Sequence, residues 1–130
     1  MFAPVQLCCL VAEDQALIGM ALQTYLEEAG IEVAGPFPSC AEALSWAEAR
    51  TPALAILDFK LRNGICSHLA KTLLGRGVPV IIYSGLPRRA TPPELDGATW
   101  LEKPVDRESL MAEATRLAPS LARHVPRHAA

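Results

Sequence analysis

Short apolar runs alternate along this 130-residue chain with amphipathic or turn-rich segments. The runs are rich in valine, isoleucine, leucine and alanine and show little polar alternation, which is typical of strands buried on both faces of a parallel sheet. Because helical patterns separate most of them, the order of elements is strand, then helix, repeated. The predicted strands cover residues 5–11, 31–34, 53–58, 78–84 and 99–102.

The first two segments between strands carry clear helical signals. Apolar side chains recur at helical spacing over residues 16–29 and predict a helix there. Ser39 followed by Glu42 is a capping-box pattern, which predicts a second helix from that point to about residue 50.

The second half of the chain has two further helical patterns and one gap. Ile65, Leu69 and Leu73 form the apolar stripe of a third helix. Residues 85–98 contain three prolines, so we expect a loop with one short turn of helix at most. Asp106 is the predicted N-cap of a last helix.

The chain length is that of one ordinary domain. We predict a single domain over residues 1–118 and a tail over residues 119–130, where Pro119 and Pro126 interrupt the pattern and the chain frays or extends. No apolar stretch approaches the length of a membrane span, and the start lacks the basic region of a secretory signal. We therefore expect a cytoplasmic protein.

Cysteine usage and charge exclude some classes of protein. Cys8, Cys9, Cys40 and Cys66 lack the paired short spacings of a zinc site, so we interpret them as small buried apolar residues in a reducing compartment. The formal net charge is -2, and residues 116–130 contribute three arginines and no acid, which leaves -5 for the rest of the chain. A mildly acidic body argues against nucleic acid as the main partner.

Polar side chains follow four of the apolar runs, at the point where each strand gives way to a loop. In an open α/β sheet the loops at the carboxyl ends of the strands form the ligand crevice. The sequence therefore predicts one site that combines three acids, a hydroxyl group and an ammonium group. These residues are Glu13 and Asp14, Asp58, Ser84, and Lys103 followed by Pro104.

Three carboxylates in one crevice suit a hard divalent cation, Mg²⁺ or Mn²⁺, together with a phosphoryl group. Asp14 and Asp58 are the expected direct ligands. Glu13 would act through water or from the second shell, and the backbone carbonyl of Lys60 would complete the protein's share.

With metal present, Asp58 is suited to attack a phosphoryl donor in line and form an aspartyl phosphate. Lys103 would neutralise one phosphate oxygen, and the Ser84 hydroxyl would donate a hydrogen bond to another. Each of these residues alone has a commoner structural role, as a helix cap, a turn residue or a solvated charge. Their joint occurrence at four strand ends carries the inference.

From Val5 to about Leu117 the chain resembles the receiver domain of bacterial response regulators. The resemblance rests on Glu13-Asp14, Asp58, Ser84-Gly85 and Lys103-Pro104 after the first, third, fourth and fifth strands. It is greatest to the stand-alone receivers of alphaproteobacteria, in which the fourth helix is degraded. The resemblance implies a flavodoxin-like, doubly wound, five-stranded parallel sheet in the order 2-1-3-4-5, with a shortened or missing fourth helix.

The resemblance also assigns roles to individual residues. It makes Asp58 the phosphoacceptor and the Lys103–Pro104 peptide bond cis, an isomer that only X–Pro bonds adopt cheaply. Trp100 would be a switch aromatic whose rotamer follows Ser84, and the other interpretation is a partly exposed tryptophan packed on the last helix. Because tryptophan is bulkier than the usual tyrosine or phenylalanine, we expect its full inward swing to be hindered.

We therefore predict a single-domain response regulator of a two-component system or phosphorelay. It would accept a phosphoryl group from a histidine kinase or a phosphotransfer protein. It would then signal through phosphorylation-dependent protein binding, as a monomer or a phosphorylation-dependent homodimer, or serve as a phosphate shuttle or sink. We class it as a phosphoacceptor that catalyses its own Mg²⁺-dependent phosphorylation and dephosphorylation rather than as an enzyme, and we expect no nucleic acid or membrane partner.

Three alternatives remain. A receiver-like scaffold would bind its partner without phosphorylation. A flavin or nucleotide carrier would need an anion-binding loop, whereas the turn at residues 13–16 is acidic and free of glycine. A metal-dependent phosphatase or hydrolase would need a second acid just after Asp58 to act as general acid, but Phe59 and Lys60 follow Asp58.

Overall fold

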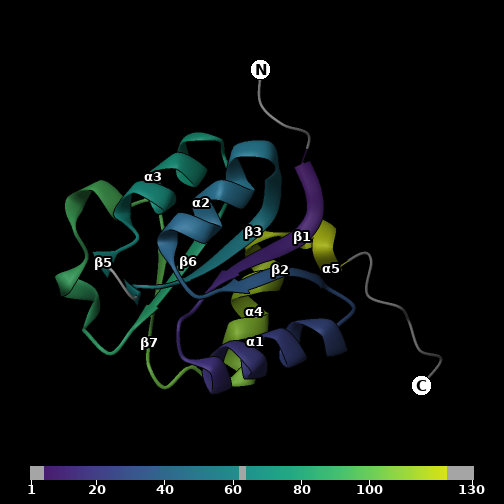
Figure 1. The fold of residues 1–130 in the computed structure, drawn as a ribbon. Helices are drawn as coiled ribbons and strands as arrows, with labels where there is room; N and C mark the ends of the chain where they lie inside the picture. The colour runs from purple at the N-terminus through teal and green to yellow at the C-terminus, as the bar shows by residue number, and fades with distance from the viewer. Residues whose placement is uncertain (1–4, 62–63, 123–130) are drawn as a thin grey trace.

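A five-stranded parallel sheet lies at the centre of the computed structural model, which describes residues 5–61 and 64–122 (Figure 1). The strand order is β2-β1-β3-β6-β7, which confirms the predicted order 2-1-3-4-5. Every neighbouring pair in this sheet is parallel. The strands are β1 Val5–Ala12, β2 Glu32–Phe37, β3 Thr51–Asp58, β6 Val80–Ser84 and β7 Thr99–Glu102.

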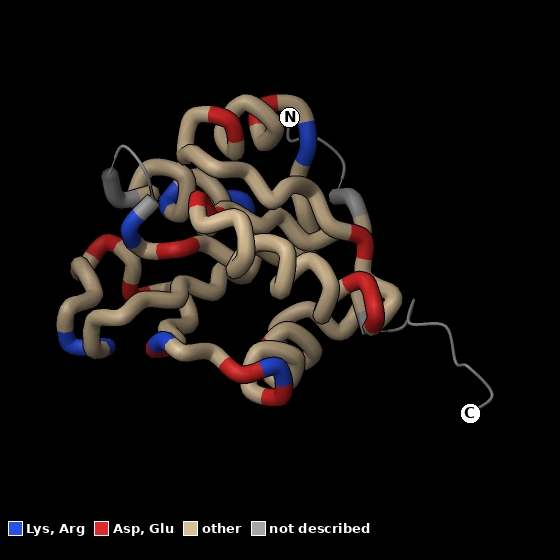
Figure 2. The backbone as a smooth tube through the Cα atoms, turned by 60° about the horizontal axis from the view of Figure 1, so that its bottom comes forward, with Lys and Arg blue, Asp and Glu red and all other residues tan. Residues whose placement is uncertain are grey.

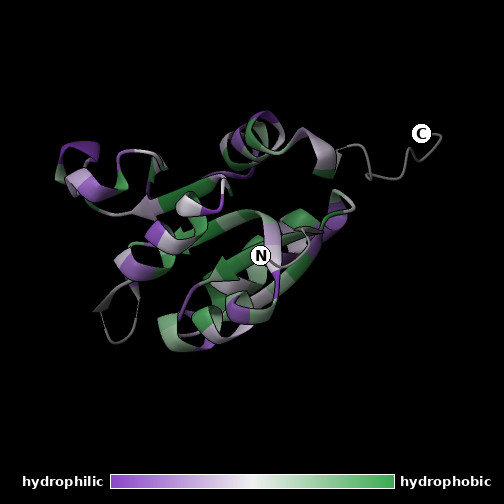
Figure 3. Cartoon of the chain, turned by 90° about the horizontal axis from the view of Figure 1, so that it is seen from above, coloured by the Kyte–Doolittle hydropathy of each residue, from purple (hydrophilic) through white to green (hydrophobic). Residues whose placement is uncertain are grey.

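Helices cover both faces of the sheet and enclose two apolar cores (Figure 1). Alternate residues of β3 serve the two cores: Leu54 and Ile56 pack on one side, and Ala55 and Leu57 on the other. Both faces of this strand are therefore apolar, as Figure 3 shows for the centre of the sheet. One layer holds α1 Ala16–Glu28, α4 Arg107–Leu117 and α5 Pro119–Ala122, and the other holds α2 Cys40–Ala49 and α3 Ser67–Gly75.

Side-chain caps start two of the helices where the sequence predicts them. The Ser39 hydroxyl accepts a hydrogen bond from the Glu42 N–H at 3.2 Å and begins α2. The Asp106 carboxylate accepts one from the Ser109 N–H at 2.7 Å and begins α4. Because each cap satisfies a backbone donor that the helix leaves free, these local signals fix the helix starts.

Two connections differ from the prediction. Residues 85–98 hold two short 3₁₀ turns, η1 Arg88–Ala90 and η2 Pro93–Leu95, where at most one turn was expected. The prolines exclude a regular helix here but fit the start of a tight turn. After Asp58, β4 Lys60–Leu61 and β5 Gly64–Ile65 form an antiparallel hairpin that was not predicted, and α3 begins only after it.

The first residues of the predicted tail also differ from the expected conformation. Residues 119–122 form α5 rather than a fraying tail, and Leu121 is 3% exposed within the core that α1 and α4 cover. A single buried leucine anchors this short helix to the core, although Pro119 interrupts the helical pattern in the sequence. The rest of the predicted tail, residues 123–130, lies outside the described residues. Among the helices of residues 5–61 and 64–122, none has the length and apolar character needed to cross a membrane.

The cysteines fall into two pairs. Cys8 and Cys9 are buried free thiols, as expected, and burial raises the pKa of Cys8 to about 11, so its thiolate is disfavoured. Cys40 and Cys66 instead form a disulfide with Cα atoms 5.7 Å apart, which corrects the interpretation of all four as apolar filler. The bond joins the starts of α2 and α3, which lie side by side on one face of the sheet (Figure 1).

Replacing Cys40 with serine should lower the free energy of unfolding by about 3 kcal/mol without reductant, because the bond closes a loop with a sequence separation of 26. Urea unfolding of wild type and Cys40→Ser measures this difference. With dithiothreitol present the two proteins should unfold at closely similar urea concentrations. A stability difference that reductant leaves unchanged would contradict a role for the bond.

Candidate functional site

The four polar strand ends meet at one edge of the sheet because their strands are parallel and in register. Asp58 pairs with Tyr83, one residue before Ser84, and Ser84 pairs with Glu102, one residue before Lys103. Within the inner strands β1, β3 and β6, Asp58 at the end of β3 is the one charged residue. Most other charged positions lie in loops and helices (Figure 2). In these three strands the charge therefore lies at this edge.

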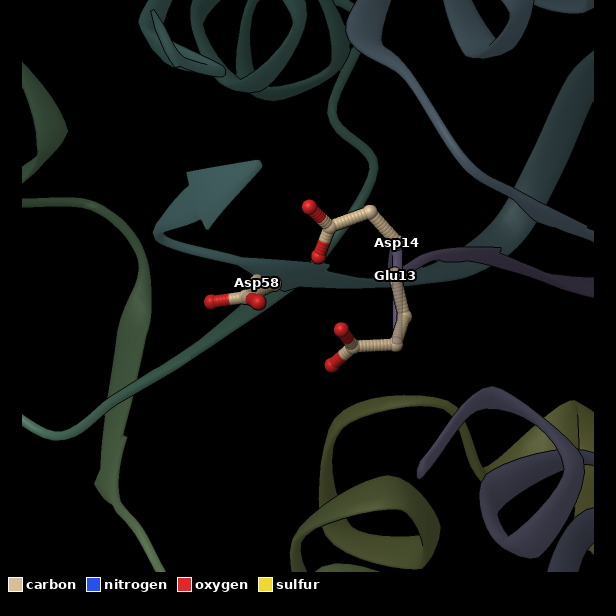
Figure 4. Close-up of side chains that lie close together, drawn as sticks. All are labelled: Glu13, Asp14 and Asp58. Atoms are coloured by element: carbon tan, nitrogen blue, oxygen red, sulfur yellow. The ribbon is translucent and has the colours of Figure 1, made fainter. Parts of the chain in front are cut away.

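Three carboxylates face a common space at this edge (Figure 4). Glu13, Asp14 and Asp58 each offer an oxygen, and these oxygens all lie within 4.8 Å of one another. Glu13 is 3% exposed and Asp58 4%, while Asp14 is half-buried. A cavity of about 240 Å³ opens beside Glu13 and Asp14. An all-oxygen, acidic and accessible set of donors fits a hard cation such as Mg²⁺.

Asp58 is held at both carboxylate oxygens. The Lys103 ammonium lies 3.3 Å from Oδ2, and the backbone N–H of Lys60 donates to Oδ1 at 3.2 Å. These contacts compensate a charge that is almost completely removed from water. The structure therefore joins Lys103 to the acidic cluster, as the sequence predicts.

Glu13 is the most deeply buried acid of the group, and its own contacts do not fully offset that burial. Burial raises its pKa above the usual 4.5, and the neighbouring Asp58 charge adds to the shift. Hydrogen bonds from the Gln15 N–H at 2.8 Å and from the Tyr83 hydroxyl oppose it. Burial and the bond to Glu13 likewise raise the pKa of Tyr83, so the phenol stays a donor.

Tyr83 is a site residue that the sequence reasoning missed. A tyrosine in the last apolar position of β6 looked like one more strand residue. The signal that could have identified it is the phenol itself, since a buried tyrosine hydroxyl usually finds a hydrogen-bond partner.

Ser84, Lys60 and Pro104 lie at the same edge with contacts of their own. The Ser84 hydroxyl is 3% exposed and accepts a hydrogen bond from the Leu86 N–H at 2.9 Å. Lys60 turns its side chain outward and contacts Asp58 through its backbone N–H. The Lys103–Pro104 peptide bond is cis, as expected.

Trp100 lies inward, which corrects two expectations. It is 6% exposed and packs against Phe59 with ring centroids 5.0 Å apart, and its indole N–H donates to the Leu86 carbonyl at 3.2 Å. Strand alternation turns this position of β7 toward the face that α2 and α3 cover, away from the last long helix α4. Trp100 is therefore not a partly exposed residue on that helix. Its size does not prevent it from lying inward.

Comparison with known proteins gives a consistent result. The model of the response regulator receiver domain family matches residues 9–115. The transcriptional regulatory protein PdtaR of Mycobacterium tuberculosis is 37% identical over 84 residues, which are 62% of this chain. The chain spans only 40% of the length of that relative.

Solved structures agree with the family model. The receiver domain of Francisella response regulator 1452 has a TM-score of 0.76 and 26% identity, with 88% of this chain and 98% of that chain covered. The receiver domain of Erythrobacter litoralis PhyR has a TM-score of 0.75 and 22% identity, with 86% and 89% covered, and this second likeness concerns the fold alone.

Replacing Glu13 with glutamine should stabilise the metal-free protein at neutral pH. A raised pKa in the folded state means that the contribution of Glu13 to stability is fully present below its usual pKa of 4.5 and is lost as the pH rises through the raised value. The difference in free energy of unfolding between variant and wild type should therefore increase from pH 4.5 upward. Urea unfolding in chelator at several pH values measures it, and a difference that does not vary with pH would contradict the burial of an ionised Glu13.

Proposed function

Because the chain belongs to the response regulator receiver domain family, we propose that Asp58 accepts a phosphoryl group from a histidine kinase or a phosphotransfer protein. The observation that carries this proposal is the position of Asp58 between two further carboxylates and a lysine, at the carboxyl edge of the sheet. The carboxylates suit a divalent cation, and the lysine ammonium suits a phosphate oxygen.

In the proposed reaction a carboxylate oxygen of Asp58 attacks phosphorus. A new O–P bond forms, and the bond to the donor atom breaks with its electron pair leaving on the donor. Asp14 and Asp58 would hold Mg²⁺, Glu13 would act through water or from the second shell, and the carbonyl of Lys60 would complete the set. When bound, the ion offsets phosphoryl charge.

Lys103 has a defined part in this scheme. In the unphosphorylated protein its ammonium pairs with Asp58 Oδ2 at 3.3 Å. After transfer, the same ammonium would neutralise a phosphoryl oxygen attached to that carboxylate. The 3.3 Å pair supports this role, because the ammonium already lies beside the carboxylate that would carry the phosphoryl group.

Ser84 would pass the change to the surface. Its oxygen accepts a hydrogen bond from the Leu86 N–H, which leaves the hydroxyl hydrogen free to donate to a phosphoryl oxygen. The Leu86 carbonyl in turn accepts from the Trp100 indole. A shift of Ser84 toward the phosphoryl group would thus disturb both hydrogen bonds and move Trp100, which makes this side chain the proposed switch.

The output that we propose is a phosphorylation-dependent change in protein binding, with service as a phosphate shuttle or sink as the other use of the same chemistry. A phosphoryl group adds about -1.5 to -2 charge, enough to bias a surface with two conformations. The domain would act as a monomer or as a phosphorylation-dependent homodimer. We propose the cytoplasm as its location, where disulfides are usually transient.

Incubation with Mg²⁺ and acetyl phosphate should add one phosphoryl group to the wild-type protein and none to Asp58→Ala, as intact mass measures. Asp96→Ala, which removes an exposed aspartate outside the cluster, is the matched control and should be modified like wild type. If neither acetyl phosphate nor a phosphorylated kinase modifies wild type, the domain acts as a phosphorylation-independent scaffold and the proposal is wrong.

Phosphorylation should change the fluorescence of Trp100. The chain has two tryptophans, so a Trp46→Phe background leaves Trp100 as the reporter. Ser84→Ala in that background should still accept a phosphoryl group, more slowly, but lose most of the emission change, because the hydroxyl that couples the site to Leu86 is gone. Equal emission changes with and without the hydroxyl would refute the proposed link.

A further inference from the structure

Tyr83 lies at the centre of the site, and the phosphoryl-transfer scheme leaves it without a role. It is 2% exposed and pairs in register with Asp58 across β3 and β6. The other β6 residues before Ser84 are valine and isoleucine, so a phenol here brings a polar group into an otherwise apolar strand. Burying that hydroxyl without a partner would be costly, and its partner is an acid of the site.

The Tyr83 side chain contacts two charged groups of the site. Its hydroxyl donates to Glu13 Oε1, and the Lys103 ammonium lies 5.0 Å from the centre of its ring. A cation near an aromatic ring is attracted to the ring face. Since Lys103 also pairs with Asp58, Tyr83 connects Glu13, which directly follows β1, to the cation that faces the proposed phosphoacceptor.

The hydroxyl completes the fixation of Glu13. The Gln15 N–H donates to Oε2 at 2.8 Å, and Tyr83 donates to Oε1, so a separate donor holds each carboxylate oxygen. A carboxylate fixed at both oxygens keeps one orientation. Its remaining lone pairs then point in set directions, which is what an outer-shell acid needs in order to orient a metal-bound water.

We propose that Tyr83 is a positioning residue that orients Glu13 through its hydroxyl and supports Lys103 through its ring, before metal and phosphoryl donor bind. This inference rests on the function proposed above and adds a residue to it. The two contributions of this side chain can be separated, because Tyr83→Phe removes the hydroxyl and keeps the ring.

The first test is the Mg²⁺ affinity, measured by calorimetry on the whole chain. Tyr83→Phe should weaken Mg²⁺ binding about tenfold, the lower end of what losing an outer-shell partner costs. Tyr25→Phe is the matched control, because Tyr25 packs against the same core from α1 and its ring faces Arg107 rather than a site residue. The control should bind Mg²⁺ as wild type does.

A double-mutant cycle separates positioning from a general loss of packing. In a Glu13→Ala background the hydroxyl has no carboxylate to orient, so Tyr83→Phe should have little further effect on the Mg²⁺ affinity. Thermal unfolding of all four proteins verifies that each is folded. Equal affinities in wild type and Tyr83→Phe, additive losses in the cycle, or no Mg²⁺ binding by wild type would each overturn the proposal.

The ring is tested by the phosphorylation rate at saturating Mg²⁺. Tyr83→Leu should then react about threefold more slowly than Tyr83→Phe, as expected from losing one cation–ring contact. Equal rates in these two variants would overturn the role of the ring. A failure of wild type to accept any phosphoryl group would refute the proposed function alone, because the Mg²⁺ cycle still decides whether Tyr83 orients Glu13.

Discussion

The burial of Asp58 is the constraint on which the rest of the site depends. A carboxylate that is 4% exposed must be compensated by charge and hydrogen bonds, and Lys103 and the backbone of Lys60 supply both. Lys60 follows β3 directly, whereas Lys103 lies 45 residues after Asp58 and meets it because parallel strands end at the same edge. The sheet topology is therefore the physical basis of the chemistry.

The same edge gathers more negative charge than it neutralises. Glu13, Asp14 and Asp58 face one another, and one ammonium pairs with them in the described residues. Burial raises the pKa of Glu13, and the neighbouring Asp58 carboxylate adds to the shift. A divalent cation would relieve the repulsion, so the arrangement that reduces stability without metal is the one that favours metal binding.

Two contact paths lead away from the edge. One runs from Ser84 through Leu86 to Trp100, which fills the face that α2 and α3 cover. The other runs from Lys103 through Tyr83 to Glu13 on the opposite face, which α1 and α4 cover. Ser84 and Tyr83 are neighbours in β6, so strand alternation directs their side chains to opposite faces. Adjacent residues of one strand thus contact groups on opposite faces of the sheet.

Local patterns in the sequence determined the five main strands, the capped helix starts and the polar residues at the strand ends, because each depends on neighbours a few positions away. The family resemblance added the strand order. Contacts between distant positions were decided by the tertiary structure: the Cys40–Cys66 bond spans 26 residues and the Tyr83–Glu13 bond 70. Leu121 likewise became an anchor only once a core existed to receive it. Periodicity reports which face a side chain takes, whereas packing decides which distant side chain it meets there.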